Sequence, residues 1–353
     1  MSPNHNARVL IVDDSVTMRA FFGAIFERAR GIDVVGTAAS AEEARELMAR
    51  LRPNVVTLDV EMPGMSGLDF LDEIMRERPM PVIMLSSLTQ QGAATSFEAL
   101  ERGAVDCFPK PTSSNREEFA ARLCALVIAA ANGNARFARY ARERPVRTTP
   151  VIHSRPFDWN GKIVAMSAST GGVDALLRIL PALPSDCPPI VIALQIEPDF
   201  VPPLLQRLNQ RCHAKIVPAE DGRMLERGVV QLACDPGAHA VIDRWPDPSL
   251  RLVRSDPLNG ARPSASLLFM TAAKTAGANA IGVILTGMGT DGAAGLKMLH
   301  DLGGHTIAQD AATCLVDHAT NAARTGGAVR QDLPVDAIAG AVLDHCRRIA
   351  AAA

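Results

Sequence analysis

The feature of this 353-residue chain that most constrains its fold is a set of carboxylates placed directly after short apolar runs. Asp13 and Asp14 follow the run at 9–12, and Asp59 follows the run at 55–58. Apolar runs separated by helical patterns are typical of parallel strands in a doubly wound sheet, whose carboxyl ends meet at one edge. We therefore expect the three carboxylates to converge at the edge of an α/β domain.

Apolar runs and helical patterns alternate five times between residues 8 and 128. The predicted strands cover 8–12, 33–38, 55–58, 82–85 and 105–107, and the predicted helices cover 16–29, 41–51, 66–77, 92–102 and 115–131. This alternation indicates a parallel sheet with helices on both faces. The first domain is therefore predicted to be a doubly wound α/β domain within residues 1–131.

The residues expected at this sheet edge favour phosphoryl chemistry. Asp13, Asp14 and Asp59 would repel one another, and Mg²⁺ relieves such repulsion through oxygen ligands. A carboxylate beside Mg²⁺ can attack phosphorus, and Asp59 is the expected phosphorylation site. Ser86 and Lys110, at the ends of the fourth and fifth strands, are expected to contact the phosphoryl oxygens. The alternative is that all five are ordinary solvated loop residues.

Residues 8 to about 128 resemble the receiver domain of bacterial response regulators. The resemblance implies a flavodoxin-like fold, Mg²⁺ as cofactor and a histidine kinase as phosphodonor. Such domains usually carry an aromatic residue shortly before the lysine, and here Cys107 stands at that place beside Phe108. Either the signal is transmitted differently, or both residues simply belong to the core.

Residues 132–160 interrupt the alternation. They contain six arginines, three prolines and little apolar periodicity, which predicts a linker with a short helix at about 134–144. The arginines raise the alternative of a nucleic-acid contact. Because the formal net charge of the chain is −2, no nucleic-acid partner is predicted.

A second α/β domain, also doubly wound, is predicted for residues 161–353. Its expected strands cover 162–167, 190–195, 214–218, 229–233, 239–243, 281–285 and 305–308, and its expected helices cover 173–180, 199–210, 264–276, 291–302 and 334–350. The stretch 212–255 is expected to be rich in β-structure because it carries repeated turn signals.

Ser169 stands between a predicted buried strand and a predicted helix. The backbone of Thr170, Gly171 and Met288 is expected to bind an oxyanion there. Asp291 follows a glycine-rich turn at the end of another strand, and a serine with an aspartate at two strand ends makes two thirds of a catalytic triad. The alternative for Ser169 is a helix cap.

Residues 161 to about 345 resemble the catalytic domain of the chemotaxis protein-glutamate methylesterases, the CheB family. The matching segments are 168–172, 219–222, 262–264, 285–292 and 306–310. The resemblance implies a Rossmann-like domain that hydrolyses methyl-glutamate esters and deamidates glutamines on methyl-accepting chemoreceptors. It implies Ser169 as nucleophile and Asp291 as orienting acid, and a receiver domain that blocks the site until a chemotaxis histidine kinase phosphorylates it.

The chain departs from that family at the catalytic histidine. The family's Gln-His-Met-Pro run reads Gln-Ile-Glu-Pro at 195–198, and Ile196 cannot accept a proton. His239 is the candidate substitute for the missing base. Two further departures are Ala319-Thr320, where a Met-Pro pair is expected, and Ser266, where an acidic residue is expected.

Composition and the terminus predict a cytoplasmic protein without membrane insertion. No apolar run approaches the about 20 residues that span a bilayer, and the start of the chain lacks a signal-peptide pattern. Seven cysteines without CxxC spacing favour reduced thiols.

Two classes of function stay open. The first is a phosphorylation-regulated hydrolase and deamidase that acts on chemoreceptors. The second is a pseudoenzyme whose receiver domain gates binding to a chemoreceptor or kinase without turnover.

Overall fold

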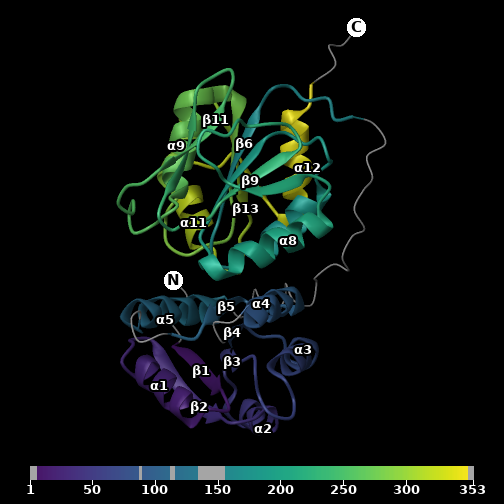
Figure 1. Cartoon of the computed structure of the whole chain (residues 1–353). Coiled ribbons are helices and arrows are strands. Elements are labelled where there is room, and N and C mark those ends of the chain that lie inside the picture. Colours follow the sequence, from purple (N-terminus) through teal and green to yellow (C-terminus); the bar gives the residue numbers. More distant parts are fainter. Residues whose placement is uncertain (1–5, 87–89, 112–115, 134–155, 349–353) are drawn as a thin grey trace. The chain divides into compact units, whose positions relative to one another are not determined.

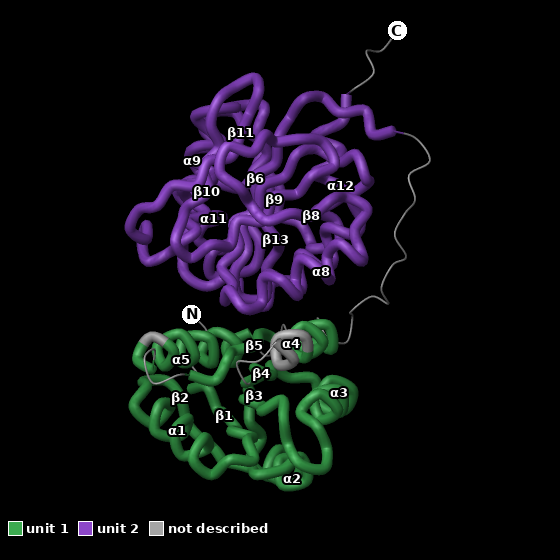
Figure 2. The backbone as a smooth tube through the Cα atoms, viewed as in Figure 1, with its two compact units in different colours: residues 1–145 green, residues 146–353 purple. Residues whose placement is uncertain are grey.

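The computed structural model describes residues 6–86, 90–111, 116–133 and 156–348 (Figure 1). The chain forms two compact units, residues 1–145 and 146–353 (Figure 2). Most of the predicted linker, with its expected helix at 134–144, lies outside the described residues. The boundaries of that linker stay predictions.

The first unit is a five-stranded sheet with helices between the strands (Figure 1). Its elements are β1 (Ala7–Val12), α1 (Val16–Glu27), β2 (Ile32–Ala38), α2 (Ala41–Leu51), β3 (Val55–Asp59), α3 (Gly67–Glu77), β4 (Val82–Ser86), α4 (Gln90–Arg102), β5 (Asp106–Pro109) and α5 (Arg116–Asn132). The strand order is β2-β1-β3-β4-β5, and the paired strands are parallel.

Burial explains why the strands of this unit read as continuous apolar runs. Every residue of β3 and β4 is buried, as expected for parallel strands covered on both faces. Phe22 and Phe26 bury the inner side of α1, and Phe70 does so for α3. The order in which successive strands are added to the sheet reverses between β1 and β3, and ligands of such sheets usually bind at the carboxyl ends of the strands at this point.

The second unit is built on a seven-stranded parallel sheet of order β14-β13-β12-β6-β7-β9-β8. Its strands are β6 (Ile163–Ala168), β7 (Ile190–Leu194), β8 (Lys215–Pro218), β9 (Val229–Ala233), β10 (His239–Asp243), β11 (Ser249–Val253), β12 (Ala280–Ile284), β13 (His305–Gln309) and β14 (Gln331–Leu333). Its α-helices are α7 (Gly172–Ile179), α8 (Val201–Arg211), α9 (Ala265–Ala276), α10 (Ala293–Asp301), α11 (His318–Thr325) and α12 (Val335–Cys346). The prediction of two doubly wound α/β domains is confirmed.

An antiparallel hairpin, β10–β11, stands apart from the main sheet and packs against α9. Leu268, Phe269 and Leu250 join its inner face to a buried apolar cluster that reaches the main sheet. This cluster holds the start of α9 in place, and that helix start carries part of the site described below. No helix in the described part of the chain is long and apolar enough to cross a bilayer.

Candidate functional site

The first unit brings the predicted acidic residues together. Asp13 follows β1 and Asp59 ends β3, and both are buried, whereas Asp14 is exposed. Each offers a carboxylate oxygen, and these three oxygens lie within 4.8 Å of one another. The loop after β3 folds back so tightly that a Cβ on Gly67 would come within 2.0 Å of the Asp59 carbonyl oxygen. Glycine at that position therefore lets α3 begin directly beside the acidic cluster.

Lys110 neutralises part of this negative charge. Its Nζ lies 2.8 Å from Asp59 Oδ2 and 3.0 Å from Asp13 Oδ2. Burial raises the pKa of Asp59 above its ordinary value, and the bond from Lys110 only partly opposes this. Burial acts to lower the pKa of Lys110, but its pairing with Asp59 and Asp13 outweighs that effect and raises the pKa.

The donor set fits a small hard cation. Among the described residues, the buried Asp13 Oδ2 has the ion pair with Lys110 Nζ, 3.0 Å away, and no further hydrogen-bond partner. An oxygen in this state, with two more carboxylates beside it, is suited to Mg²⁺, which takes oxygen ligands and retains water. The acidic cluster is compatible with Mg²⁺ binding, as predicted.

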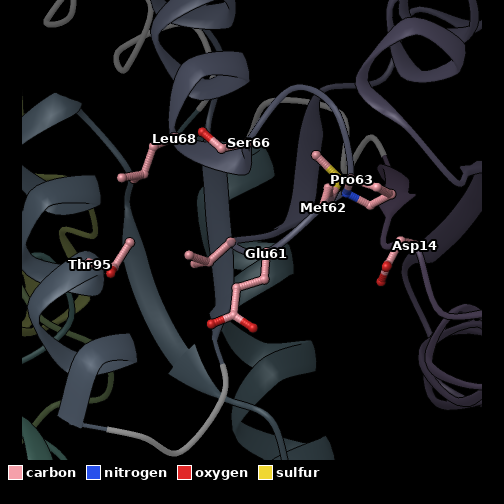
Figure 3. A pocket seen from close by; sticks show the side chains of 8 residues that line it. Asp14, Glu61, Met62, Pro63, Ser66, Leu68 and Thr95 are labelled. Carbon is pink, nitrogen blue, oxygen red and sulfur yellow. The ribbon is translucent and has the colours of Figure 1, made fainter.

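A pocket of about 530 Å³ opens next to the cluster. Figure 3 shows the side chains of Asp14, Glu61 and Thr95 among those that line it. The backbone amide of Glu61 donates a hydrogen bond to Asp59 Oδ1, at 3.3 Å. An open pocket, lined by Asp14 and by residues of the loop after β3 and of α4, therefore lies beside the candidate phosphorylation site.

Ser86 ends β4 beside this cluster. Its backbone carbonyl accepts a hydrogen bond from the Lys110 amide at 2.7 Å, which ties the two predicted phosphate contacts together. The Ser86 hydroxyl accepts a hydrogen bond from Ser96 Oγ at 3.1 Å. The sequence did not point to Ser96, because a single serine within a helical pattern carries no signal of its own.

In the second unit, Ser169 follows β6 and lies next to the turn after β12. Ser169 Oγ accepts a hydrogen bond from the Met288 amide at 3.1 Å, and the Ser169 amide donates to the Thr286 carbonyl at 3.2 Å. The Thr286 hydroxyl donates to the Thr170 carbonyl at 3.0 Å. Gly171 precedes α7 with φ +75°, which leaves the Thr170–Gly171 backbone at the helix start beside the serine. The structure therefore brings the predicted nucleophile and the predicted oxyanion residues together.

Asp291 lines the same small pocket as Ser169, with a volume of about 20 Å³, which is room for about one water molecule. The start of α9 donates three hydrogen bonds to the Asp291 carboxylate. The carboxylate accepts hydrogen bonds from Ser264 Oγ at 2.9 Å, from the Ala265 amide at 2.7 Å and from the Ser266 amide at 3.0 Å. These three partners were not predicted as site residues, although a serine before an apolar helical run is a recognisable N-cap signal.

The hydrogen bonds of His239 do not support its role as a substitute base. His239 is fully buried, and its Nδ1 accepts a hydrogen bond from the Ser264 amide at 3.1 Å. Nε2 must then carry the proton, which it donates to the Asp256 carbonyl at 3.0 Å. Both ring nitrogens are thus occupied by backbone groups, and His239 does not line the Ser169 pocket. Its role is to hold Ser264, which in turn binds Asp291.

No histidine of the described residues lines the Ser169 pocket. Gln195 lines the pocket, and its side-chain amide donates a hydrogen bond to the Pro263 carbonyl at 3.4 Å. Ile196 follows it, half-buried and outside the pocket lining. Within the described part of the chain, the site therefore contains a serine, an aspartate and an amide donor, and no imidazole.

Comparison with known proteins identifies the family. A family model described as CheB methylesterase matches residues 164–342, and one described as response regulator receiver domain matches residues 9–122. The chain is 44% identical over 337 residues to a protein-glutamate methylesterase/protein-glutamine glutaminase of Agrobacterium fabrum, with 96% of each chain covered. The chain belongs to the CheB methylesterase family.

Other CheB proteins are also similar to this chain in sequence and in structure. A protein-glutamate methylesterase/protein-glutamine glutaminase of Caulobacter vibrioides is 43% identical over 338 residues, covering 96% of this chain and 97% of the relative. The crystal structure of the Thermotoga maritima CheB methylesterase catalytic domain has a TM-score of 0.50 at 33% identity, covering 52% of this chain and 98% of that one. The predicted resemblance to CheB is confirmed.

The departures from the CheB pattern have local structural consequences. Ala319, at the first position of the expected Met-Pro pair, is buried and lines the Ser169 pocket. Ser266, which stands where the resemblance predicts an acidic residue, accepts a hydrogen bond from the Gly292 amide at 2.8 Å. In this CheB chain, Ser266 thus helps to fix the turn that carries Asp291.

Proposed function

We propose that the chain is a phosphorylation-controlled chemotaxis protein that hydrolyses methyl-glutamate esters, and deamidates glutamines, on methyl-accepting chemoreceptors. Ser169 is the nucleophile and Asp291 the acidic residue of the site. One observation carries the proposal: Ser169 Oγ lies 3.1 Å from the Met288 amide. A nucleophile this close to a backbone donor places the oxyanion of a tetrahedral intermediate where it is stabilised.

The chemistry follows from that contact. Ser169 Oγ gives up its proton and bonds to the ester carbonyl carbon, and the Met288 amide donates a hydrogen bond to the new oxyanion. The bond between that carbon and the methoxy oxygen then breaks, and the methoxy group takes up a proton and leaves as methanol. Water then attacks the acyl-serine and releases the glutamate carboxylate, which regenerates Ser169. Because no imidazole lines the pocket among the described residues, the serine proton passes to water, and we expect slow turnover.

The receiver domain, which we place within residues 1–131, supplies control. A chemotaxis histidine kinase donates a phosphoryl group to Asp59, and Ser86 and Lys110 contact its oxygens. Asp13, Asp14 and Asp59 would hold Mg²⁺, which supplies charge neutralisation for phosphoryl transfer. Seven free cysteines are consistent with a cytoplasmic location for this reaction.

A second candidate function is favoured by Ile196 and by the occupied His239. In it, the fold binds a chemoreceptor or kinase under phosphorylation control and does not turn over. Ser169 and Met288 would then serve only to shape the binding surface.

The test is methanol release from a methylated chemoreceptor, with a small phosphodonor and Mg²⁺ present, compared between the natural chain and Ser169→Ala. Release that depends on Ser169 supports the hydrolase. Equal background release from both chains would reject it and leave the binding module, which co-sedimentation with receptor-containing membranes then tests directly.

A further inference from the structure

A buried chain of polar groups links β4, α4 and β5 in the first unit. Ser96 Oγ of α4 donates to Ser86 Oγ of β4 at 3.1 Å, and Cys107 Sγ of β5 donates to the Ser96 carbonyl at 3.2 Å. Ser86 and Ser96 are each 1% exposed, and Cys107 is 7% exposed. The three residues therefore form a continuous path across the interior, from the phosphorylation site to a helix and a neighbouring strand.

At this buried position, an apolar side chain would cost less free energy than the serine that is present. Serine is a weaker helix former than alanine, and a buried hydroxyl loses its hydrogen bonds to water. The buried neighbours of Ser96 on its own helix are apolar: Phe97, Ala99 and Leu100. The hydrogen bond between Ser96 and Ser86 offsets part of that loss, and an apolar residue in place of Ser96 would leave Ser86 with one hydrogen bond fewer.

The direction of the bonds leaves one proton available at the phosphorylation site. Ser86 Oγ accepts from Ser96, and a hydroxyl can donate one hydrogen bond while it accepts. Ser86 lies next to the end of β3, because Leu85 pairs with Asp59 in the sheet. An aspartyl phosphate at residue 59 would offer charged oxygens to the Ser86 proton, and bonds to charged acceptors are the shorter and stronger ones.

The anchor at the other end is a neutral thiol. Burial raises the pKa of Cys107 well above its ordinary value, so the thiol keeps the proton that it donates to the Ser96 carbonyl. Ser96 is thus held by its side chain toward β4 and by its carbonyl toward β5. A shift of Ser86 toward a phosphoryl group would therefore pull on the hydrogen bond from Ser96 to Ser86, while the bond from Cys107 to the Ser96 carbonyl stays in place.

We propose that Ser96 is the positioning residue that carries the phosphorylation state of Asp59 from Ser86 to α4, in the role that receivers usually give to an aromatic side chain on the fifth strand. This inference rests on the proposed function, because it takes Asp59 as the phosphoryl acceptor. When Ser86 donates to the phosphoryl group, Ser96 follows it and α4 shifts against β5.

The experiment measures hydrogen exchange of the α4 amides in the full-length chain, with Mg²⁺, before and after addition of acetyl phosphate. Occupancy of Asp59 is measured in the same samples by intact mass. In the natural chain, phosphorylation should change α4 exchange. In Ser96→Ala, occupancy should be unchanged while the exchange shift falls by about two- to tenfold, the range that one neutral hydrogen bond supports.

Two further variants separate coupling from simple damage. Thr57→Val is the matched control, because Thr57 is a fully buried residue of the same sheet whose hydroxyl has no hydrogen-bond partner among the described residues. This variant should respond as the natural chain does. Ser96→Cys keeps a weak donor at similar volume and should give an intermediate shift. It also keeps the test intact if Ser96→Ala does not fold.

The outcomes distinguish the inference from the function beneath it. A full α4 response in Ser96→Ala, with Asp59 phosphorylated, overturns the coupling role of Ser96 and leaves the phosphorylation site standing. If the natural chain is phosphorylated and the exchange of its α4 amides does not change, the coupling role of Ser96 is likewise overturned and the phosphorylation site stands. If acetyl phosphate does not modify Asp59, the proposed function of the receiver domain fails, and the role of Ser96 fails with it.

Discussion

Gly287 lies so close to Ser169 that a Cβ on the glycine would come within 2.5 Å of the serine Oγ. Gly287→Ala should therefore push Ser169 away from the Met288 amide and destabilise the second unit by about 1–3 kcal/mol, as overpacking does. Any Ser169-dependent methanol release should be lost as well. Urea denaturation gives the first quantity and the receptor assay the second.

Gly340→Ala is the matched control for that substitution. Gly340 lies in α12, and apart from its chain neighbours and the adjacent helix backbone no described atom would come within 4 Å of its added Cβ. Stability should stay constant or rise by about 0.5–1 kcal/mol, because alanine is the better residue in a helix. Equal midpoints for both variants would show that the contact between Gly287 and Ser169 is not tight.

Ile196→His should raise methanol release, because Ser169, Met288 and Asp291 are already in place. A general base contributes about 10²–10⁴-fold, so a gain of at least about 100-fold is expected. The double variant Ile196→His/Ser169→Ala checks that the gain uses the serine. No gain in the single variant would mean that the backbone around 196, and not only its side chain, differs from that of an active site.

Mg²⁺ should stabilise the first unit because it relieves the repulsion among Asp13, Asp14 and Asp59. At 100 times the dissociation constant, the free energy of unfolding should rise by about 2.7 kcal/mol. Thermal unfolding with and without Mg²⁺ measures the gain, which Asp13→Asn should largely remove. Glu46→Gln, an exposed acid on α2, should keep it. A full gain in Asp13→Asn would place the cation elsewhere.

Asp59→Asn should abolish labelling by a small phosphodonor in the presence of Mg²⁺. The amide cannot act as the nucleophile, although it is nearly the same size as the carboxylate. Intact mass spectrometry gives the readout, and labelling of Glu46→Gln under the same conditions serves as the reference. Persistent labelling of the Asp59→Asn chain would assign the phosphoryl group to another residue.

His305 and His345 should make the second unit sensitive to acid. Their rings stack with centroids 3.5 Å apart, and burial lowers the pKa of both below the ordinary value. The folded chain therefore resists protonation that the unfolded chain accepts, so stability should fall as pH drops below about 6.5. His345→Phe keeps a ring in the stack and should flatten the fall in urea midpoints, whereas the exposed His213→Ala should not.

The sheet architecture could be predicted because parallel strands bury both faces and read as unbroken apolar runs. The strand β14 was not predicted, because Gln331–Leu333 is a three-residue strand at the edge of the sheet, paired among the described strands with β13 alone. The helix α11 escaped because His318–Thr325 is rich in residues of low helix propensity, and its buried Ala319, Thr320 and Ala323 become an inner face only against the sheet.

The site was predictable wherever strand order alone decides proximity. Asp13 and Asp59 follow strands that are neighbours in any sheet of this topology, and Ser169 and Asp291 follow a second neighbouring pair. The bonds from Ser96 to Ser86 and from Ser264 to Asp291 depend instead on where a helix docks. Local sequence does not encode that docking.

The hydrogen bonds between the start of α9 and Asp291 give that aspartate a structural role as well as a proposed catalytic one, so its presence in a chain does not by itself indicate hydrolase activity. Its carboxylate completes the hydrogen bonding of a helix end, so replacing it would disturb the fold even in a chain that never cleaves an ester. A lineage that abandons hydrolysis can therefore lose its histidine and still retain this acid for structural reasons. We therefore expect Asp291 to be retained in CheB chains with and without hydrolase activity, and the residue at the position of Ile196 to distinguish between them.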